Sequence, residues 1–203
     1  MTTLSAKIVS TIFHPLLVPT YALLLLMNLN THSILSIPEN YRYIVVGFVF
    51  IFTFLIPTLI ILITVRLGKV GSLQMETQRE RVFPLLMVAV LFYATYYMLK
   101  QASMSGLITF FMVGSTMLVL ITLLINYATK ISLHMTAWGG LLGTLFGFAI
   151  RFQYNLTLVI FSLILLIGII AAARLKLNAH KPFQIYLGFL LGSIGMSCLF
   201  FLV

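Results

Sequence analysis

The sequence Arg174-Leu-Lys-Leu-Asn-Ala-His180-Lys-Pro-Phe-Gln184 separates two apolar runs, residues 155–173 and 183–203, near the end of the chain. About 20 apolar residues are enough for one helix to cross the hydrocarbon core of a bilayer. Because both runs have about that length and the segment between them is short and basic, the pattern predicts two transmembrane helices joined at the membrane surface. Charged groups at such a boundary are tolerated where they reach the interface or serve a function.

The composition extends this interpretation to the whole chain. Of the 203 residues, 62% are hydrophobic and 7% are charged, and the mean hydropathy is +1.16. Soluble globular domains carry far more charge, so we expect an all-α, polytopic membrane helix bundle in which residues 1–203 form a single domain. Seven apolar runs can be counted: 8–28, 43–65, 82–99, 105–127, 134–150, 155–173 and 183–203. The third and fifth are short, so six crossings with a re-entrant segment remain an alternative.

The distribution of charge predicts the orientation of the chain. The net charge is +9, and the loops on the side of the N-terminus hold nine cations against three on the other side. The nine are Lys7, Arg66, Lys69, Arg79, Arg81, Lys130, Arg174, Lys176 and Lys181, and the three are Arg42, Lys100 and Arg151. This asymmetry predicts a cytoplasmic N-terminus. The membrane is expected to be a bacterial inner membrane. We expect the first run to be a retained helix rather than a signal peptide, and we expect no nucleic-acid partner.

Prolines predict irregular geometry in the first two helices. His14-Pro15 and Pro19 lie in the first run and Pro57 lies near the middle of the second, and each proline removes a backbone donor. His14 is expected to be a hydrogen-bonded structural residue. Residues 66–81 are expected to be a loop, from which Arg79 or Arg81 can lean towards a phosphate.

Glycines predict which helices pack closely. Gly139, Gly143 and Gly147 recur every four residues in the fifth run, and the seventh run contains Gly188, Gly192 and Gly195. Small residues let two membrane helices approach each other closely, so we expect the fifth and seventh helices to pack together. His134 and His180, each beside the start of its helix, would then lie at the same membrane level.

These two helix starts have the composition of an anion site. Ser132 is a plausible N-cap for the fifth helix and Pro182 suits the first turn of the seventh. Helix N-termini attract anions, and the planar guanidinium of Arg174 matches phosphate oxygens. Further cations nearby are Lys130, Lys176 and Lys181. Because His134 and His180 can act as nucleophile or proton donor near neutral pH, the arrangement predicts chemistry on a phosphate whose remaining bulk lies in lipid.

The sequence Ser132-Leu-His134, followed by Arg174-x5-His180 and then by Gly188, resembles the type 2 phosphatidic acid phosphatase family, which includes the lipid phosphate phosphatases. The family has three motifs: Lys-x6-Arg-Pro, Pro-Ser-Gly-His and Ser-Arg-x5-His-x3-Asp. Ser132 and His134 match the second motif, and Arg174 and His180 match the third. Arg81 is the best candidate for the arginine of the first motif, so that the resemblance spans about residues 74–192.

The resemblance implies metal-independent hydrolysis of a lipid phosphate or polyprenyl diphosphate, without a cofactor. His180 would be the nucleophile that forms a phosphohistidine, and His134 would protonate the leaving group. The phosphate-binding residues would be Arg174, Arg81, Ser132 and Lys130.

The chain also departs from the family pattern. Gln184 stands where the family has an aspartate that orients the nucleophilic histidine, Ile131 and Leu133 replace a proline and a glycine, and Gln74 replaces the lysine of the first motif. The Gln184 carbonyl can still orient the ring, one helical turn away, although it brings no charge. Two alternatives therefore stand beside the phosphatase: a catalytically degenerate relative that binds or carries a lipid phosphate, and an unrelated small transporter. The headgroup and the oligomeric state stay open.

Overall fold

The structure is a computed structural model that describes residues 1–28, 37–68, 75 and 77–201, and the regular elements in these ranges are all helical. Within these ranges, seven helical stretches are long and apolar enough to cross a membrane, which confirms the expected all-α membrane bundle. They are Thr3–Met27, Glu39–Arg66, Gln78–Gln101, Gly106–Asn126, Leu133–Phe152, Thr157–Lys176 and Pro182–Phe201. The shortest have 20 residues, and a helix of that length extends about 30 Å, the thickness of the hydrocarbon core.

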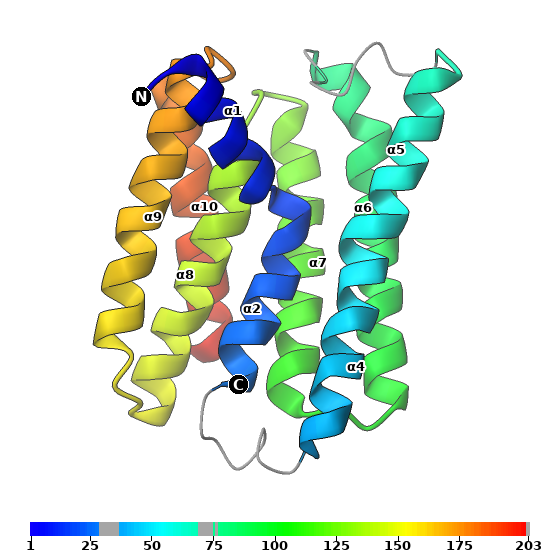
Figure 1. The fold of residues 1–203 in the computed structure, drawn as a ribbon, viewed down its shortest axis with the longest axis vertical. Coiled ribbons are helices and arrows are strands. Elements are labelled where there is room, and N and C mark those ends of the chain that lie inside the picture. The colour runs from blue at the N-terminus through cyan, green and yellow to red at the C-terminus, as the bar shows by residue number, and fades with distance from the viewer. Residues whose placement is uncertain (29–36, 69–74, 76, 202–203) are drawn as a thin grey trace. The chain divides into compact units, whose positions relative to one another are not determined.

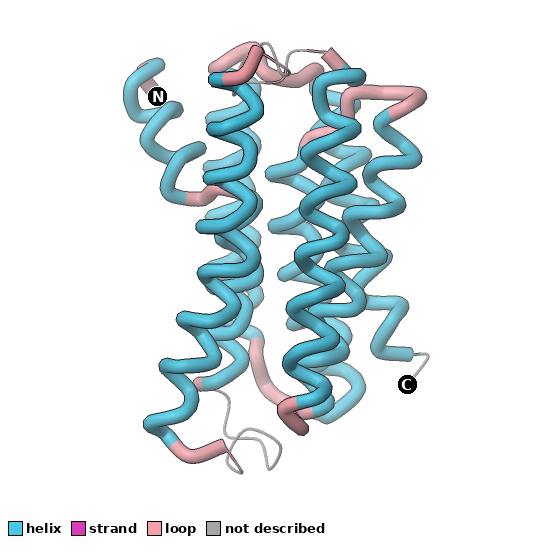
Figure 2. Tube along the Cα trace, turned by 90° about the vertical axis from the view of Figure 1, so that its right-hand side faces the viewer, coloured by secondary structure: helices cyan, strands magenta, loops and turns pink. Residues whose placement is uncertain are grey.

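The chain forms two compact units. One, here called the terminal unit, consists of Met1–Val18 and Ala128–Val203, and the other, the central unit, consists of Pro19–Tyr127. Within each unit the helices lie side by side (Figures 1 and 2). That residues 1–203 form a single domain stays a prediction.

The central unit contains an interrupted second span. Its helices are α2 (Val18–Met27), α4 (Glu39–Phe50), α5 (Ile56–Arg66), α6 (Gln78–Gln101) and α7 (Gly106–Asn126). A π-helical segment, η2 (Ile51–Leu55), joins α4 to α5. Pro57 lies in the first turn of α5 and has no N–H for the carbonyl one turn earlier. The irregularity predicted at Pro57 takes the form of this wider turn.

Helix α6 begins earlier than its apolar run. Thr77 and Glu80 form a capping box, in which Glu80 N–H donates to Thr77 Oγ1 at 3.4 Å and Thr77 N–H donates to Glu80 Oε2 at 3.3 Å. Arg79 and Arg81 therefore lie in the first turn of a helix rather than in a loop, which corrects the expected loop 66–81. The third span has 24 residues and the fifth has 20, so neither is too short to cross.

The terminal unit is organised around one buried helix. Its elements are α1 (Thr3–Ile12), the short 3-10 helix η1 (Pro15–Leu17), α8 (Leu133–Phe152), α9 (Thr157–Lys176) and α10 (Pro182–Phe201). Helix α10 packs along the whole of α8, while α9 packs against α1 and α8. Most of α8 is buried, whereas most of α9 and α10 is half-buried or exposed.

Glycines explain the close packing of α8 and α10. A Cβ added at Gly139 would lie 2.6 Å from the Phe189 carbonyl oxygen, and one at Gly188 would lie 2.8 Å from the Ser132 carbonyl oxygen. Side chains at Gly143 and Gly192 would collide with the carbonyls of Ser193 and Thr136. The predicted pairing of the fifth and seventh helices is therefore confirmed. Because the contacts advance in the same direction along both helices, α8 and α10 are parallel and their N-termini lie at the same end of the unit.

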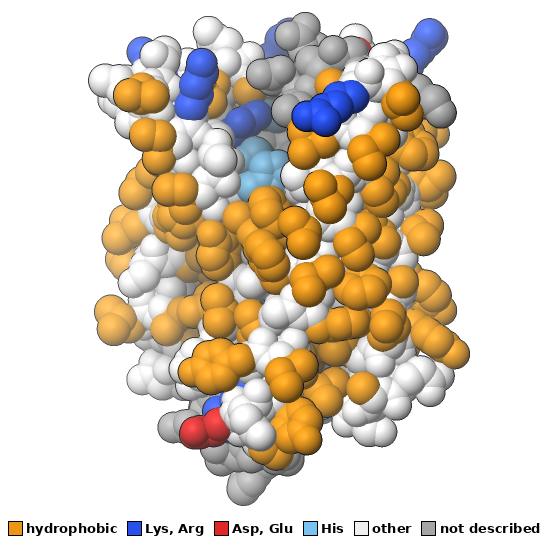
Figure 3. Space-filling view, turned by 45° about the vertical axis from the view of Figure 1, so that its right-hand side comes forward, with side chains coloured by type: hydrophobic (Ala, Val, Ile, Leu, Met, Phe, Trp, Pro, Cys, Tyr) orange, Lys and Arg blue, Asp and Glu red, His pale blue; other side chains and the backbone are white. Residues whose placement is uncertain are grey.

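The outward faces of the helices are hydrophobic. Leu158, Phe161 and Leu165 of α9 are 81%, 65% and 64% exposed. In the space-filling view, hydrophobic side chains cover the flank of the visible face and Lys and Arg side chains gather towards the helix ends (Figure 3). This pattern is that of helices whose flanks contact lipid, and the protein is an integral membrane protein.

Replacing Gly192 by alanine is expected to destabilise the protein by about 1–3 kcal/mol, because the new methyl group meets the backbone of α8. Gly168→Ala is the matched control, since a Cβ at Gly168 in α9 meets nothing within 4 Å. That control should be neutral, or stabilising by up to about 1 kcal/mol through helix propensity. The measurement is the unfolding midpoint of both variants in the same detergent. Equal midpoints for the two variants would contradict the packing described for α8 and α10.

Candidate functional site

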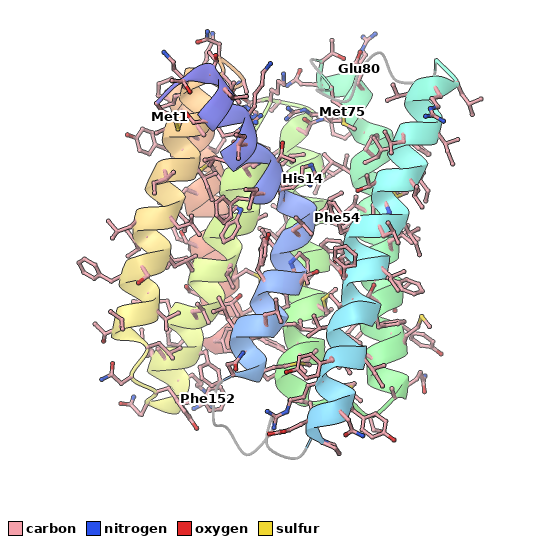
Figure 4. All side chains as sticks on the ribbon, in the orientation of Figure 1. Met1, His14, Phe54, Met75, Glu80 and Phe152 are labelled. Carbon is pink, nitrogen blue, oxygen red and sulfur yellow. The ribbon has the colours of Figure 1, made fainter. Side chains whose placement is uncertain are left out.

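The first span is interrupted at His14. Pro15 has no N–H, so the backbone cannot continue the α-helix beyond Ile12. Instead, Leu16 N–H donates to His14 Nδ1 at 3.3 Å and Leu17 N–H donates to the His14 carbonyl at 2.9 Å. His14 therefore caps η1 at the break (Figure 4). Its predicted hydrogen-bonded role is confirmed.

Two side chains of α8 hold the interrupted end of α1. His134 Nε2–H donates to the Ser10 carbonyl at 3.0 Å, and Trp138 Nε1–H donates to the Phe13 carbonyl at 2.9 Å. The two donors are four residues apart and so lie on one face of α8. They supply hydrogen bonds to carbonyls at a helix end that the proline leaves without intrahelical donors. Because a carbonyl oxygen only accepts, His134 carries its hydrogen on Nε2 and its lone pair on Nδ1.

Four groups from three separate parts of the sequence lie together at this end of the terminal unit. The rings of His14 and His134 have centroids 5.8 Å apart and meet edge to face at 76°. The Arg174 guanidinium, from the last turn of α9, is close enough to interact electrostatically with both rings, and His180 is close enough to interact with His134. We call His14, His134, Arg174 and His180 the imidazole–guanidinium cluster. The structure thus brings together His134, His180 and Arg174, three of the residues that the sequence analysis selected.

Several polar atoms here are buried without a hydrogen-bond partner. They are Ser10 Oγ, Ser132 Oγ and Arg174 Nε. Ser132 is fully buried, and Ser10, His134 and His180 are each 8% exposed. Most buried polar atoms in proteins are paired, so a group of unsatisfied donors at one place indicates a ligand or water that completes them.

Ser132 occupies the N-cap position of α8, as predicted, but its side chain makes no capping bond. The Ser132 carbonyl instead accepts two hydrogen bonds, from Thr136 N–H at 2.9 Å and from Thr136 Oγ1–H at 3.1 Å. The Ser132 N–H donates to the Gln184 carbonyl at 3.3 Å. The predicted hydroxyl cap is therefore wrong.

The terminal unit contains cations but no acidic side chain. The three acidic residues of the chain, Glu39, Glu76 and Glu80, all belong to the sequence of the central unit. The cations of the terminal unit are Lys7, Lys130, Arg151, Arg174, Lys176 and Lys181. A partly buried guanidinium is costly unless an anion compensates it. No carboxylate side chain of the terminal unit can do so for Arg174, and an anion from outside the chain can.

Gln184 fixes the ring of His180. Its Oε1 accepts from Lys181 N–H at 3.1 Å, which identifies this atom as the amide oxygen, and the same oxygen lies 3.3 Å from His180 Nδ1. His180 Nδ1 must therefore donate, and the lone pair of the ring is on Nε2. The Gln184 carbonyl thus makes the contact with His180 that was expected, and its part in catalysis stays a prediction.

An open cleft adjoins His180. It has a volume of about 480 Å³. Its lining residues are Lys130, Leu175, Asn178, Ala179, His180, Lys181, Pro182 and Gln184. Lys130 and Lys181, which flank the starts of α8 and α10, thus lie beside the predicted nucleophile. The cleft provides room for an anionic group between these cations.

Arg81 belongs to the central unit. It is 5% exposed, and its Nε–H donates to the Met75 carbonyl at 3.2 Å. Nearby in the chain, Gln78 accepts at its carbonyl from Asn126 Nδ2–H at 2.9 Å, so the start of α6 is tied to the end of α7. The convergence of Arg81 with the imidazole–guanidinium cluster stays a prediction. Gln74 lies outside the described residues.

Sequence reasoning missed three parts of this site: Ser10, Trp138 and the place of His14 in the cluster. The signals were present, because His14-Pro15 marks the break and His134-x3-Trp138 puts two ring N–H donors on one helical face. Nothing in the sequence indicated that these two features meet. Among the described residues, no three His, Cys, Asp or Glu side chains are grouped as a metal site requires.

No protein-family model, curated protein sequence or solved structure matches this chain. The family resemblance stays an expectation that rests on the motif residues, and the functional argument below rests on the geometry of the terminal unit.

Trp138→Phe is expected to destabilise the protein by about 1–3 kcal/mol, because it leaves the Phe13 carbonyl without the indole donor. Tyr186→Phe also removes one polar hydrogen from an aromatic ring, but Tyr186 is 66% exposed, so its unfolding midpoint should stay within experimental error of the parent. Thermal unfolding in detergent measures both. A Trp138→Phe variant as stable as the parent would show that the indole does not hold the break.

Proposed function

We propose that the protein is a membrane phosphatase that hydrolyses a lipid phosphate or a polyprenyl diphosphate without a metal. One observation carries the proposal: a partly buried guanidinium, two buried imidazoles and buried, unsatisfied hydroxyls lie at one end of a unit that has no acidic side chain. Such a site favours an anion, and phosphate has the charge and oxygen geometry that Arg174 recognises.

The ring orientations support a two-step reaction through His180. In the first step, His180 Nε2 attacks phosphorus, a nitrogen–phosphorus bond forms, and the bond to the leaving lipid oxygen breaks. Protonated His134 gives that oxygen a proton from Nδ1, because its Nε2–H is held by the Ser10 carbonyl. In the second step, water attacks phosphorus, His134 Nδ1 takes the proton, and phosphate leaves His180. Arg174 stabilises the negative charge of the phosphoryl oxygens in both steps.

A second candidate function is lipid-phosphate binding without hydrolysis. It is favoured by the neutral amide at Gln184, which orients His180 but does not stabilise the positive charge that develops on the ring as it attacks. Loss of the orienting carboxylate in a hydrolytic triad lowers the rate by about 10⁴-fold. A protein that only carries a lipid phosphate, or a partner subunit that only binds one, would need the anion site but not the negative charge of an orienting carboxylate.

Phosphate release distinguishes the two functions. Purified protein in detergent is given phosphatidate, phosphatidylglycerophosphate or undecaprenyl diphosphate without added metal. We expect release that falls at least about 10³-fold in His180→Ala, since the nucleophile is lost. Gln184→Glu keeps the length of the side chain and adds the missing charge, so it should raise the rate by about 10²-fold or more.

Asn178→Asp is the matched control for the glutamate, because Asn178 lines the same cleft but has no hydrogen bond to His180. It should leave the rate within about threefold of the parent. If the parent and Gln184→Glu both release nothing, yet the parent binds phosphatidate and Arg174→Gln does not, the binding function is correct. If Arg174→Gln binds as tightly as the parent, both functions are contradicted.

Within this proposal, the charge asymmetry of the loops favours a cytoplasmic position for the cluster, in a bacterial inner membrane. Ala128 and Asn155 are exposed residues at opposite ends of α8. With Cys198 replaced by serine, a cysteine at position 155 should react with a membrane-impermeant maleimide in intact cells, and a cysteine at position 128 should react only after lysis. The reverse pattern would refute the orientation.

A further inference from the structure

The interrupted first span contributes more than a structural cap to the imidazole–guanidinium cluster. His14 is half-buried, its ring is in edge-to-face contact with that of His134, and Arg174 is near enough to interact with both rings. A phosphate group bound between Arg174 and His134 would therefore have His14 as a neighbour. Neither the family motifs nor the mechanism above gives His14 a role.

The cap defines which nitrogen of His14 carries the ring hydrogen. Nδ1 accepts the hydrogen bond from Leu16 N–H, so the lone pair of the ring is on Nδ1 and the hydrogen is on Nε2. A ring in this tautomer presents a donor, which is what the oxygens of a phosphate require. Ser10, one turn earlier in α1, adds a buried hydroxyl without a hydrogen-bond partner. The same segment thus brings an imidazole donor and a hydroxyl to the cluster.

We propose that His14 binds the phosphate group through its Nε2–H, so that the break in the first span forms one side of the anion site. This inference rests on the proposed function and deepens it, because it assigns the site a third imidazole. With centroids 5.8 Å apart, the rings of His14 and His134 can both reach oxygens of one tetrahedral anion. His14 contacts the ligand and takes no part in the transfer of the phosphoryl group.

Two substitutions separate the cap from the ligand contact. In His14→Asn, the side-chain oxygen can take the place of Nδ1 and accept from Leu16 N–H, but no donor reaches the position of Nε2. In His14→Gln, the amide nitrogen can take the place of Nε2, while the cap is lost. A purely structural histidine is replaced better by Asn, and a ligand-binding histidine is replaced better by Gln.

Binding is measured by titration calorimetry on the purified full chain in detergent. The lipid probe is the phosphonate analogue of dioctanoyl phosphatidate, whose phosphorus–carbon bond is not hydrolysed. Inorganic phosphate is the second probe, and dioctanoylglycerol is the uncharged control. We expect His14→Asn to weaken binding of the phosphonate by about 10-fold or more, the effect of losing one hydrogen bond to a charged group. His14→Gln should bind within about threefold of the parent but unfold at a lower temperature, because it lacks the cap.

The two charged probes show which ligand the site takes. A His14→Asn effect on the phosphonate alone identifies a lipid phosphate, and an equal effect on inorganic phosphate identifies the anion itself as sufficient. Either result supports the contact with His14. If His14→Asn binds both probes as the parent does, or if His14→Gln loses as much affinity as His14→Asn, the inference is overturned.

The failure of this inference can be told from the failure of the proposed function by one further variant. Phosphonate binding that depends on Arg174, tested with Arg174→Gln, but not on His14 would overturn only the inference. Absence of phosphonate and phosphate binding in the parent would overturn both.

Discussion

The contact between the backbones of α8 and α10 is the constraint on which the rest of the terminal unit depends. Because residues 139, 143, 188 and 192 are glycines, the two helices approach until backbone carbonyls of each helix lie against the other helix. The two helices are parallel, so this contact sets the starts of both helices at one level. His134 and His180 share an end of the unit for that reason. Without the glycines, the same two histidines would still flank membrane helices, but nothing would fix them near each other.

The absence of acidic side chains from the sequence of the terminal unit gives this cluster its character. In most membrane proteins a guanidinium at the boundary is compensated by a carboxylate of the same bundle or reaches water. Here the Arg174 Nε is buried without a hydrogen-bond partner, and the nearby hydroxyls of Ser10 and Ser132 are also buried without one. Buried polar groups without partners cost free energy, and the anion that we propose would satisfy them.

Periodicity and composition were enough to predict the helical class, the seven spans and the α8–α10 pair, because apolar length and glycine spacing act locally. The start of α6 was misplaced, since the capping box at Thr77 and Glu80 extends the helix through charged residues that hydropathy assigns to a loop. The predicted cap at Ser132 was wrong because Thr136 and the α10 backbone engage its main chain and no bond forms to its hydroxyl. The hydrogen bonds from His134 and Trp138 to α1 join residues more than 120 positions apart, and no sequence pattern reports that pairing.

The break in the first span also bears on how the chain is made. The carbonyls of Ser10 and Phe13 receive their side-chain donors from residues 124 and 125 positions later. At 5–20 residues per second, a ribosome needs roughly 6–25 s to synthesise that length. During that interval the N-terminal segment has exposed peptide oxygens that lipid cannot satisfy. The break in the first span can therefore take its final form only after α8 has been made.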